Sequence, residues 1–89
     1  MLERELTVSN RLGLHARATA KLVQVLSGYP CNATLSAKGR EVNAKSIMGV
    51  MLLAAGQGTP VTVRIEGVGE AEAMDAVASL FERRFDEET

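Results

Sequence analysis

The sequence predicts an α+β fold in which a single antiparallel sheet carries its helices on one face. Val61, Val63 and Ile65 alternate with polar residues, as in a strand that is buried on one side only. Apolar residues recur every three or four positions across residues 70–85, which is typical of an amphipathic helix. The remaining elements are short and follow the order β-α-β-β-α-β-α, so four strands and three helices can pack as two layers. We expect one domain that spans residues 1–89.

The first third of the chain is expected to supply a strand and a helix. The strand covers residues 2–8, and a loop over residues 9–13 leads to a helix over residues 16–26. Gly28 and Pro30 end this helix, since glycine suits a helix C-terminus and proline cannot continue the helix. Five apolar positions are assigned to one face of this helix: Ala16, Ala20, Leu22, Val23 and Leu26.

The middle of the chain is expected to form a hairpin and a short helix. Strands over residues 32–37 and 41–44 flank a turn at residues 38–39. Ser46 directly precedes an apolar run over residues 47–55, and serine in this position is a helix N-cap signal.

The last third is expected to supply the clearest strand and the clearest helix. Residues 61–66 form the strand, and glycines at positions 67 and 69 turn the chain into the helix over residues 70–85. The acidic residues 86–88 are expected to be frayed and solvated.

Composition excludes several classes of function. Ten basic and eleven acidic residues give a net charge of −1, and only three residues are aromatic, so nucleic-acid binding is not expected. Cys31 has no second cysteine for a disulfide, and one cysteine with one histidine makes a metal site improbable. The apolar stretch 50–55 is too short to span a bilayer, and the charged first residues lack the pattern of a signal peptide. We therefore expect a cytoplasmic protein without membrane insertion, metal or cofactor.

His15, the only histidine, lies where the first loop becomes a helix. A helix start presents unpaired backbone N–H groups and the positive end of the helix dipole, which together favour a bound anion. Arg17 adds a permanent positive charge two residues later, and Gly13 permits an unusual turn just before the histidine. An imidazole is largely uncharged near neutral pH and can act as a nucleophile. These residues indicate a phosphoryl acceptor; the alternative is a surface histidine without a chemical role.

Ser46 has both a structural and a regulatory interpretation. As an N-cap its hydroxyl would bind a free backbone N–H of the next turn and contribute about 1 kcal/mol. As a phosphorylation site it would carry roughly two negative charges at a helix start, where they need not unfold the domain.

The apolar run after Ser46 predicts a contact surface. A short helix on a sheet can bury only one face, so part of the set Ile47, Met48, Met51 and Leu52 should remain exposed. Methionine is flexible and suits a surface that fits several partners. The alternative is a helix that is fully covered.

Three segments together resemble the HPr-type phosphocarrier proteins of the bacterial phosphotransferase system. These are residues 10–17 (NRLGLHAR), 45–49 (KSIMG) and 55–59 (AGQGT). The resemblance covers essentially the whole chain, with the elements in the same order. It implies an open-faced β-sandwich of four antiparallel strands and three helices.

The resemblance also implies a function. His15 would accept a phosphoryl group at Nδ1 from phospho-enzyme I, which draws on phosphoenolpyruvate, and would pass it to an enzyme IIA protein. The chain would thus be a stoichiometric carrier and not an enzyme. Arg17 would contact the phosphoryl group, and Ser46 would match the serine modified by HPr kinase/phosphorylase. We expect a monomer with this partner-binding surface: Ala16, Ala20, Ile47, Met48, Met51 and Leu52.

One departure bears on the branch of the family. Ala18 follows the arginine where the family usually has proline, which should leave Arg17 freer and supply one more N–H donor. Together with the ending at residues 80–87, this makes the chain similar to the nitrogen-related branch, NPr, which serves a regulatory enzyme IIA. A sugar-transport HPr is one alternative, and a regulatory protein that binds through residues 47–52 without carrying phosphate is another.

Overall fold

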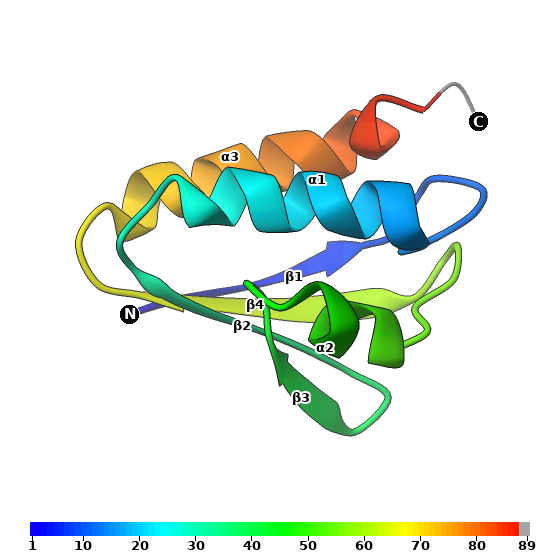
Figure 1. Cartoon of the computed structure of the whole chain (residues 1–89), viewed down its shortest axis with the longest axis horizontal. Coiled ribbons are helices and arrows are strands. Elements are labelled where there is room, and N and C mark those ends of the chain that lie inside the picture. The colour runs from blue at the N-terminus through cyan, green and yellow to red at the C-terminus, as the bar shows by residue number, and fades with distance from the viewer. Residues whose placement is uncertain (88–89) are drawn as a thin grey trace.

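The computed structural model describes residues 1–87, which form a four-stranded sheet with helices packed on it (Figure 1). The strand order in the sheet is β1-β4-β2-β3. Within the described residues, no helix has the length and apolar character needed to cross a membrane. The elements follow one another in this order: β1 (Leu2–Thr7), α1 (Ala16–Ser27), β2 (Asn32–Ala37), β3 (Arg40–Asn43), α2 (Ile47–Leu52), β4 (Pro60–Glu66), α3 (Glu70–Glu82) and the 3-10 turn η1 (Arg84–Asp86).

All neighbouring strands are antiparallel, as predicted. The central strand β4 pairs with β1 on one side and with β2 on the other, so that Val63 lies between Arg4 and Leu35. The hairpin of β2 and β3 completes the sheet. Helices α1 and α3 lie side by side above the sheet in Figure 1, with α2 beside the β2–β3 hairpin. The predicted open-faced α+β fold is confirmed.

The alternation along β4 separates the core from the open face of the sheet. Val61, Val63 and Ile65 are fully buried beneath the helices, whereas Thr62 and Arg64 lie on the other face and are partly exposed. Helix side chains close the core from above, and the fully buried ones include Leu22, Leu26 and Val77.

The buried side of α1 includes Leu22 and Leu26, as expected, but not the two alanines assigned to it. Ala16 and Ala20 are exposed, and the side that faces the core carries Ala18, Thr19, Leu22 and Leu26. Thr19 can be buried because its hydroxyl donates a hydrogen bond to the carbonyl oxygen of Leu14, 3.1 Å away. Apolarity alone was a poor guide here, since alanine fits either face of a helix.

Helix α2 is shorter than the predicted helix over residues 47–55. It ends at Leu52, and Ala54 adopts a left-handed backbone conformation with φ +49°. This turn buries Leu53, while side chains from the hairpin bind the freed carbonyls. Lys38 Nζ donates to Ala54 O at 2.9 Å, and Arg40 donates to Leu52 O at 3.3 Å.

The C-terminal end also differs from the prediction. Helix α3 ends at Glu82 instead of continuing to Phe85, because the chain turns through three residues of positive φ, from Arg84 to Asp86. The turn buries Phe85 completely, with its ring centroid 4.9 Å from that of Phe81. The expectation of a solvated acidic end is wrong for Glu87, whose side chain is only 13% exposed. Glu88 lies outside the described residues.

Candidate functional site

His15 is the last residue before α1 and occupies the N-cap position. Its backbone is extended (φ −77°, ψ −179°), and its carbonyl accepts a hydrogen bond from Thr19 N at 2.9 Å. Among residues 1–87, no side chain accepts a hydrogen bond from the amides of the first turn of α1. The positive end of the helix is therefore open to an anion beside the imidazole.

The loop before His15 is held by close packing against the segment that follows α2. Gly13 has φ +69°, and a Cβ added there would lie 2.5 Å from Ala55 O and 2.7 Å from Gly56 Cα. Leu14 is buried, and its amide donates to the same Ala55 carbonyl at 2.9 Å. The backbone of this loop thus fixes where the imidazole stands.

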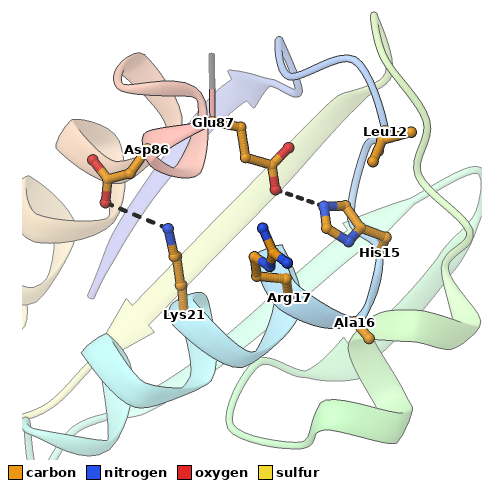
Figure 2. A pocket seen from close by; sticks show the side chains of 7 residues that line it. All are labelled: Leu12, His15, Ala16, Arg17, Lys21, Asp86 and Glu87. Carbon is orange, nitrogen blue, oxygen red and sulfur yellow. Dashed lines mark hydrogen bonds and ion pairs between the residues drawn. The ribbon is translucent and has the colours of Figure 1, made fainter. Parts of the chain in front are cut away.

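The imidazole faces a hollow of about 620 Å³ (Figure 2). The histidine side chain is 28% exposed, so a partner protein can reach it. The hollow is lined by seven residues: Leu12, His15, Ala16, Arg17, Lys21, Asp86 and Glu87. Two cations and two carboxylates thus line the same hollow as the ring, and the carboxylates come from the far end of the chain.

Glu87 contacts the histidine directly. His15 Nε2 lies 2.6 Å from Glu87 Oε2, and Asn10 Nδ2 donates to Glu87 Oε1 at 3.0 Å (Figure 2 shows the first contact). Burial raises the pKa of Glu87, but the hydrogen bonds from Asn10 and His15 and the charges of His15 and Arg17 outweigh it. The pKa therefore lies below the usual value for glutamate. The carboxylate is ionised near neutral pH.

Neither Glu87 nor Asn10 was assigned a role from the sequence. Asn10 is fully buried and also donates to Gly13 O at 2.7 Å, so it links the loop to Glu87. An asparagine in a loop five residues before the histidine was a weak signal. The sequence contained no signal that pointed to Glu87, because 72 positions separate it from His15.

The lowered pKa of Glu87 leads to a prediction on stability. A glutamate with a depressed folded-state pKa stabilises the fold above its unfolded value of 4.5, and the contribution is lost as the pH falls through the folded value. We expect Glu87→Gln to lower the free energy of unfolding by about 1 kcal/mol at neutral pH. The difference from the parent should shrink as the pH is lowered to about 3. Urea unfolding at several pH values measures it, and a constant difference would contradict the expectation.

Arg17 lies on the exposed side of the first turn of α1. Figure 2 shows its guanidinium directed toward Glu87, and it forms no ion pair within the part of the chain that the structure describes. Its neighbour Ala18 is fully buried. The arginine is therefore available to an anion bound at the helix start.

Ser46 caps the start of α2, as the sequence predicts. Ser46 Oγ accepts a hydrogen bond from Gly49 N at 3.0 Å, which confirms the N-cap. The exposed apolar side chains of this helix form the α2 patch: Ile47, Met48, Met51 and Leu52. The helix packs beside α1 and lies near the start of α1 in Figure 2, so the patch and the histidine can face one partner.

A family model described as "PTS HPr component phosphorylation site" matches residues 2–83. The chain belongs to the HPr family. HPr proteins are phosphocarriers of the phosphotransferase system and not enzymes, as the resemblance implied.

Known HPr proteins match over the full length. The chain is 70% identical over 89 residues to a phosphocarrier protein HPr of Xylella fastidiosa, with complete coverage of both. It is also similar to a crystal structure of HPr from Thermoanaerobacter tengcongensis (TM-score 0.96, 40% identity, complete coverage of both chains). A dimer structure of HPr from the same organism matches with TM-score 0.78 and 40% identity, over 98% of this chain and 100% of the other.

Proposed function

We propose that the chain accepts a phosphoryl group on His15 Nδ1 from phospho-enzyme I and passes it to an enzyme IIA protein. Family membership implies these two classes of partner. The observation that supports His15 as the acceptor is its position at a helix start that no side chain among the described residues caps. Its Nε2 is bound to Glu87, whereas Nδ1 makes no hydrogen bond within residues 1–87.

Phosphoryl transfer requires mainly positioning and compensation of charge, and the site supplies both. The lone pair of Nδ1 attacks phosphorus, while the open amides of α1 and the guanidinium of Arg17 bind the phosphoryl oxygens. Transfer of the phosphoryl group from His15 to enzyme IIA requires no additional residue of this chain.

We assign partner binding to the α2 patch together with Ala16 and Ala20. The patch is apolar, exposed and adjacent to the site, and both alanines are exposed on α1. A flexible methionine-containing surface suits a carrier that must bind a donor and several acceptors in turn.

We assign regulation to phosphorylation of Ser46, with HPr kinase/phosphorylase as the candidate modifying enzyme. Ser46→Asp is expected to stay folded, because an aspartate can cap α2 as serine does. It should accept phosphate from phospho-enzyme I about tenfold more slowly, since a charged group beside the apolar docking surface must lose hydration when the partner binds. The rate is measured by quenching the transfer from labelled phospho-enzyme I at a series of times. Ser46→Asn is the control, because asparagine can cap the helix without adding charge. Equal rates for all three proteins would contradict the regulatory role.

The nitrogen-related branch is our proposal for the pathway, and Ala18 is what supports it. The small buried alanine leaves the first turn of α1 without the proline that is usual next to the arginine. Transfer to a regulatory enzyme IIA should be at least tenfold faster than transfer to a sugar-specific one. The reverse order would support a sugar-transport HPr.

The cellular compartment and the oligomeric state of the protein are also proposals. We propose one domain over the whole chain that acts in the cytoplasm as a monomer. Sedimentation at micromolar concentration tests the last point, and a stable dimer there would contradict it.

A reconstituted relay tests the function. Labelled phosphoenolpyruvate, enzyme I and the chain are incubated, and purified enzyme IIA is then added. Label should appear on the chain only with enzyme I present and should then move to enzyme IIA. A chain that binds enzyme IIA but never acquires label would be the non-phosphorylated regulatory protein instead.

A further inference from the structure

The contact between Glu87 and His15 fixes more than the position of the ring. A neutral imidazole carries one proton, on either Nδ1 or Nε2, and the nitrogen without the proton is the nucleophile. An ionised carboxylate can only accept hydrogen bonds, so the ring nitrogen that faces it must donate. The 2.6 Å contact joins Glu87 to Nε2.

We propose that Glu87 is a positioning residue that keeps the ring proton of His15 on Nε2 and so leaves the Nδ1 lone pair free to accept phosphate. The inference rests on the proposed function, because it explains which ring nitrogen reacts. In Figure 2, Nδ1 lies on the side of the ring away from Glu87, above the start of α1. The free lone pair is thus on the side of the ring toward the start of α1, whose open amides would bind the phosphoryl oxygens.

Asn10 fixes the orientation of the carboxylate. Its Nδ2 group donates both to Gly13 O at 2.7 Å and to Glu87 Oε1 at 3.0 Å. Because Asn10 is fully buried, its amide cannot turn outward without losing both bonds. One carboxylate oxygen is held by Asn10, and the other is left for His15.

The backbone turn that places Glu87 beside His15 is conformationally strained. Arg84, Phe85 and Asp86 have φ values of +55°, +56° and +62°, a left-handed conformation that is unfavourable for residues with a side chain. Burial of Phe85 offsets this cost, and Lys21 Nζ ties the turn to α1 through a 2.7 Å bond to Phe85 O. This turn reverses the chain after α3 and so places Glu87 over the hollow.

The transfer step is balanced with Glu87 in this role. The Nδ1 lone pair forms the bond to phosphorus, and the bond between phosphorus and the donor group of phospho-enzyme I breaks. The donor group keeps the electron pair of that bond. The ring retains its Nε2 proton and becomes positively charged, and the carboxylate of Glu87 stabilises this charge.

The variant Glu87→Gln separates the two tautomers. Asn10 Nδ2 would still require an acceptor, so the glutamine oxygen should face Asn10 and its NH₂ group should face His15 Nε2. Nε2 would then have to accept, and the proton would move to Nδ1. Glu82→Gln, on the exposed side of α3, makes the same change of charge without touching the histidine and is the matched control.

Two-bond ¹⁵N–¹H correlation spectra of the ring report the tautomer directly, at a pH where the ring is neutral. We expect the Nε2–H form in the parent and in the control variant Glu82→Gln, and a shift toward the Nδ1–H form in Glu87→Gln. The same tautomer populations in all three proteins would overturn the inference. This measurement needs no phosphoryl donor, so its result does not depend on whether the carrier function is right.

The kinetic arm uses phospho-enzyme I. Glu87→Gln should accept phosphate about tenfold more slowly than the parent, and Glu82→Gln should match the parent. Equal rates for Glu87→Gln and the parent would overturn the positioning role even if the tautomer changes. If the parent itself gains no phosphate on His15, the proposed function fails and the inference fails with it.

Discussion

Replacement of His15 by alanine is expected to reduce phosphoryl acceptance from phospho-enzyme I by at least about a thousandfold. The sequence contains no second histidine, and nothing else at the start of α1 offers a nitrogen lone pair. A guanidinium group offers no lone pair for attack on phosphorus, so Arg17 cannot replace the nucleophile. Labelling from phosphoenolpyruvate in the presence of enzyme I measures the loss.

The fold should survive this substitution, which makes the loss interpretable. The bonds that hold the backbone at position 15, from His15 N to Gly13 O and from Thr19 N to His15 O, do not involve the ring. Gln24→Ala, at an exposed position of α1, is the control and should accept phosphate at the parent rate. If His15→Ala is labelled as fast as the parent, the chain does not carry phosphate on this residue, and the α2 patch alone must account for its activity.

Replacement of Gly13 by alanine is expected to destabilise the protein by about 3 kcal/mol or more. The new methyl group would lie 2.5 Å from Ala55 O and 2.7 Å from Gly56 Cα, and both are backbone atoms that cannot move independently. The positive φ of +69° adds roughly 1–2 kcal/mol of strain. Thermal unfolding should show a fall in Tm of about 12 °C or more for a domain of this size.

Gly39→Ala separates the two contributions. Gly39 has a similar φ of +77°, but an added Cβ there would meet nothing within 4 Å. This variant should lose only the cost of the backbone conformation, about 1–2 kcal/mol. Equal losses of stability at positions 13 and 39 would mean that close packing of the loop on residues 55–56 does not hold His15 in place.

Local signals in the sequence predicted much of the fold and part of the site. The alternation along 61–66 and the helical spacing after residue 70 depend only on which side chains face the core. The strand formed as expected, and the helix formed as expected from Glu70 to Glu82. Ser46 could be predicted as an N-cap because a cap depends on bonds three residues away. The placement of His15 at a helix start is local in the same sense.

Contacts between distant residues could not be predicted in this way. Glu87 meets His15 only because three left-handed residues turn the chain back over α1, and no propensity favours such a run in arginine, phenylalanine and aspartate. The burial of Ala18 and Thr19 on α1 was also missed, since Thr19 is buried through a bond to Leu14 O that its residue type does not reveal. The end of α2 depends on Lys38 from the hairpin.

The central claim is that His15 Nδ1 carries the phosphoryl group. The most direct test is a ¹H, ¹⁵N and ³¹P NMR spectrum of the uniformly ¹⁵N-labelled chain after reaction with phosphoenolpyruvate and enzyme I. A phosphorus–nitrogen coupling to Nδ1 of His15, with the proton still on Nε2, is the predicted result. Coupling to Nε2, or phosphorus bound to any other residue, would contradict it.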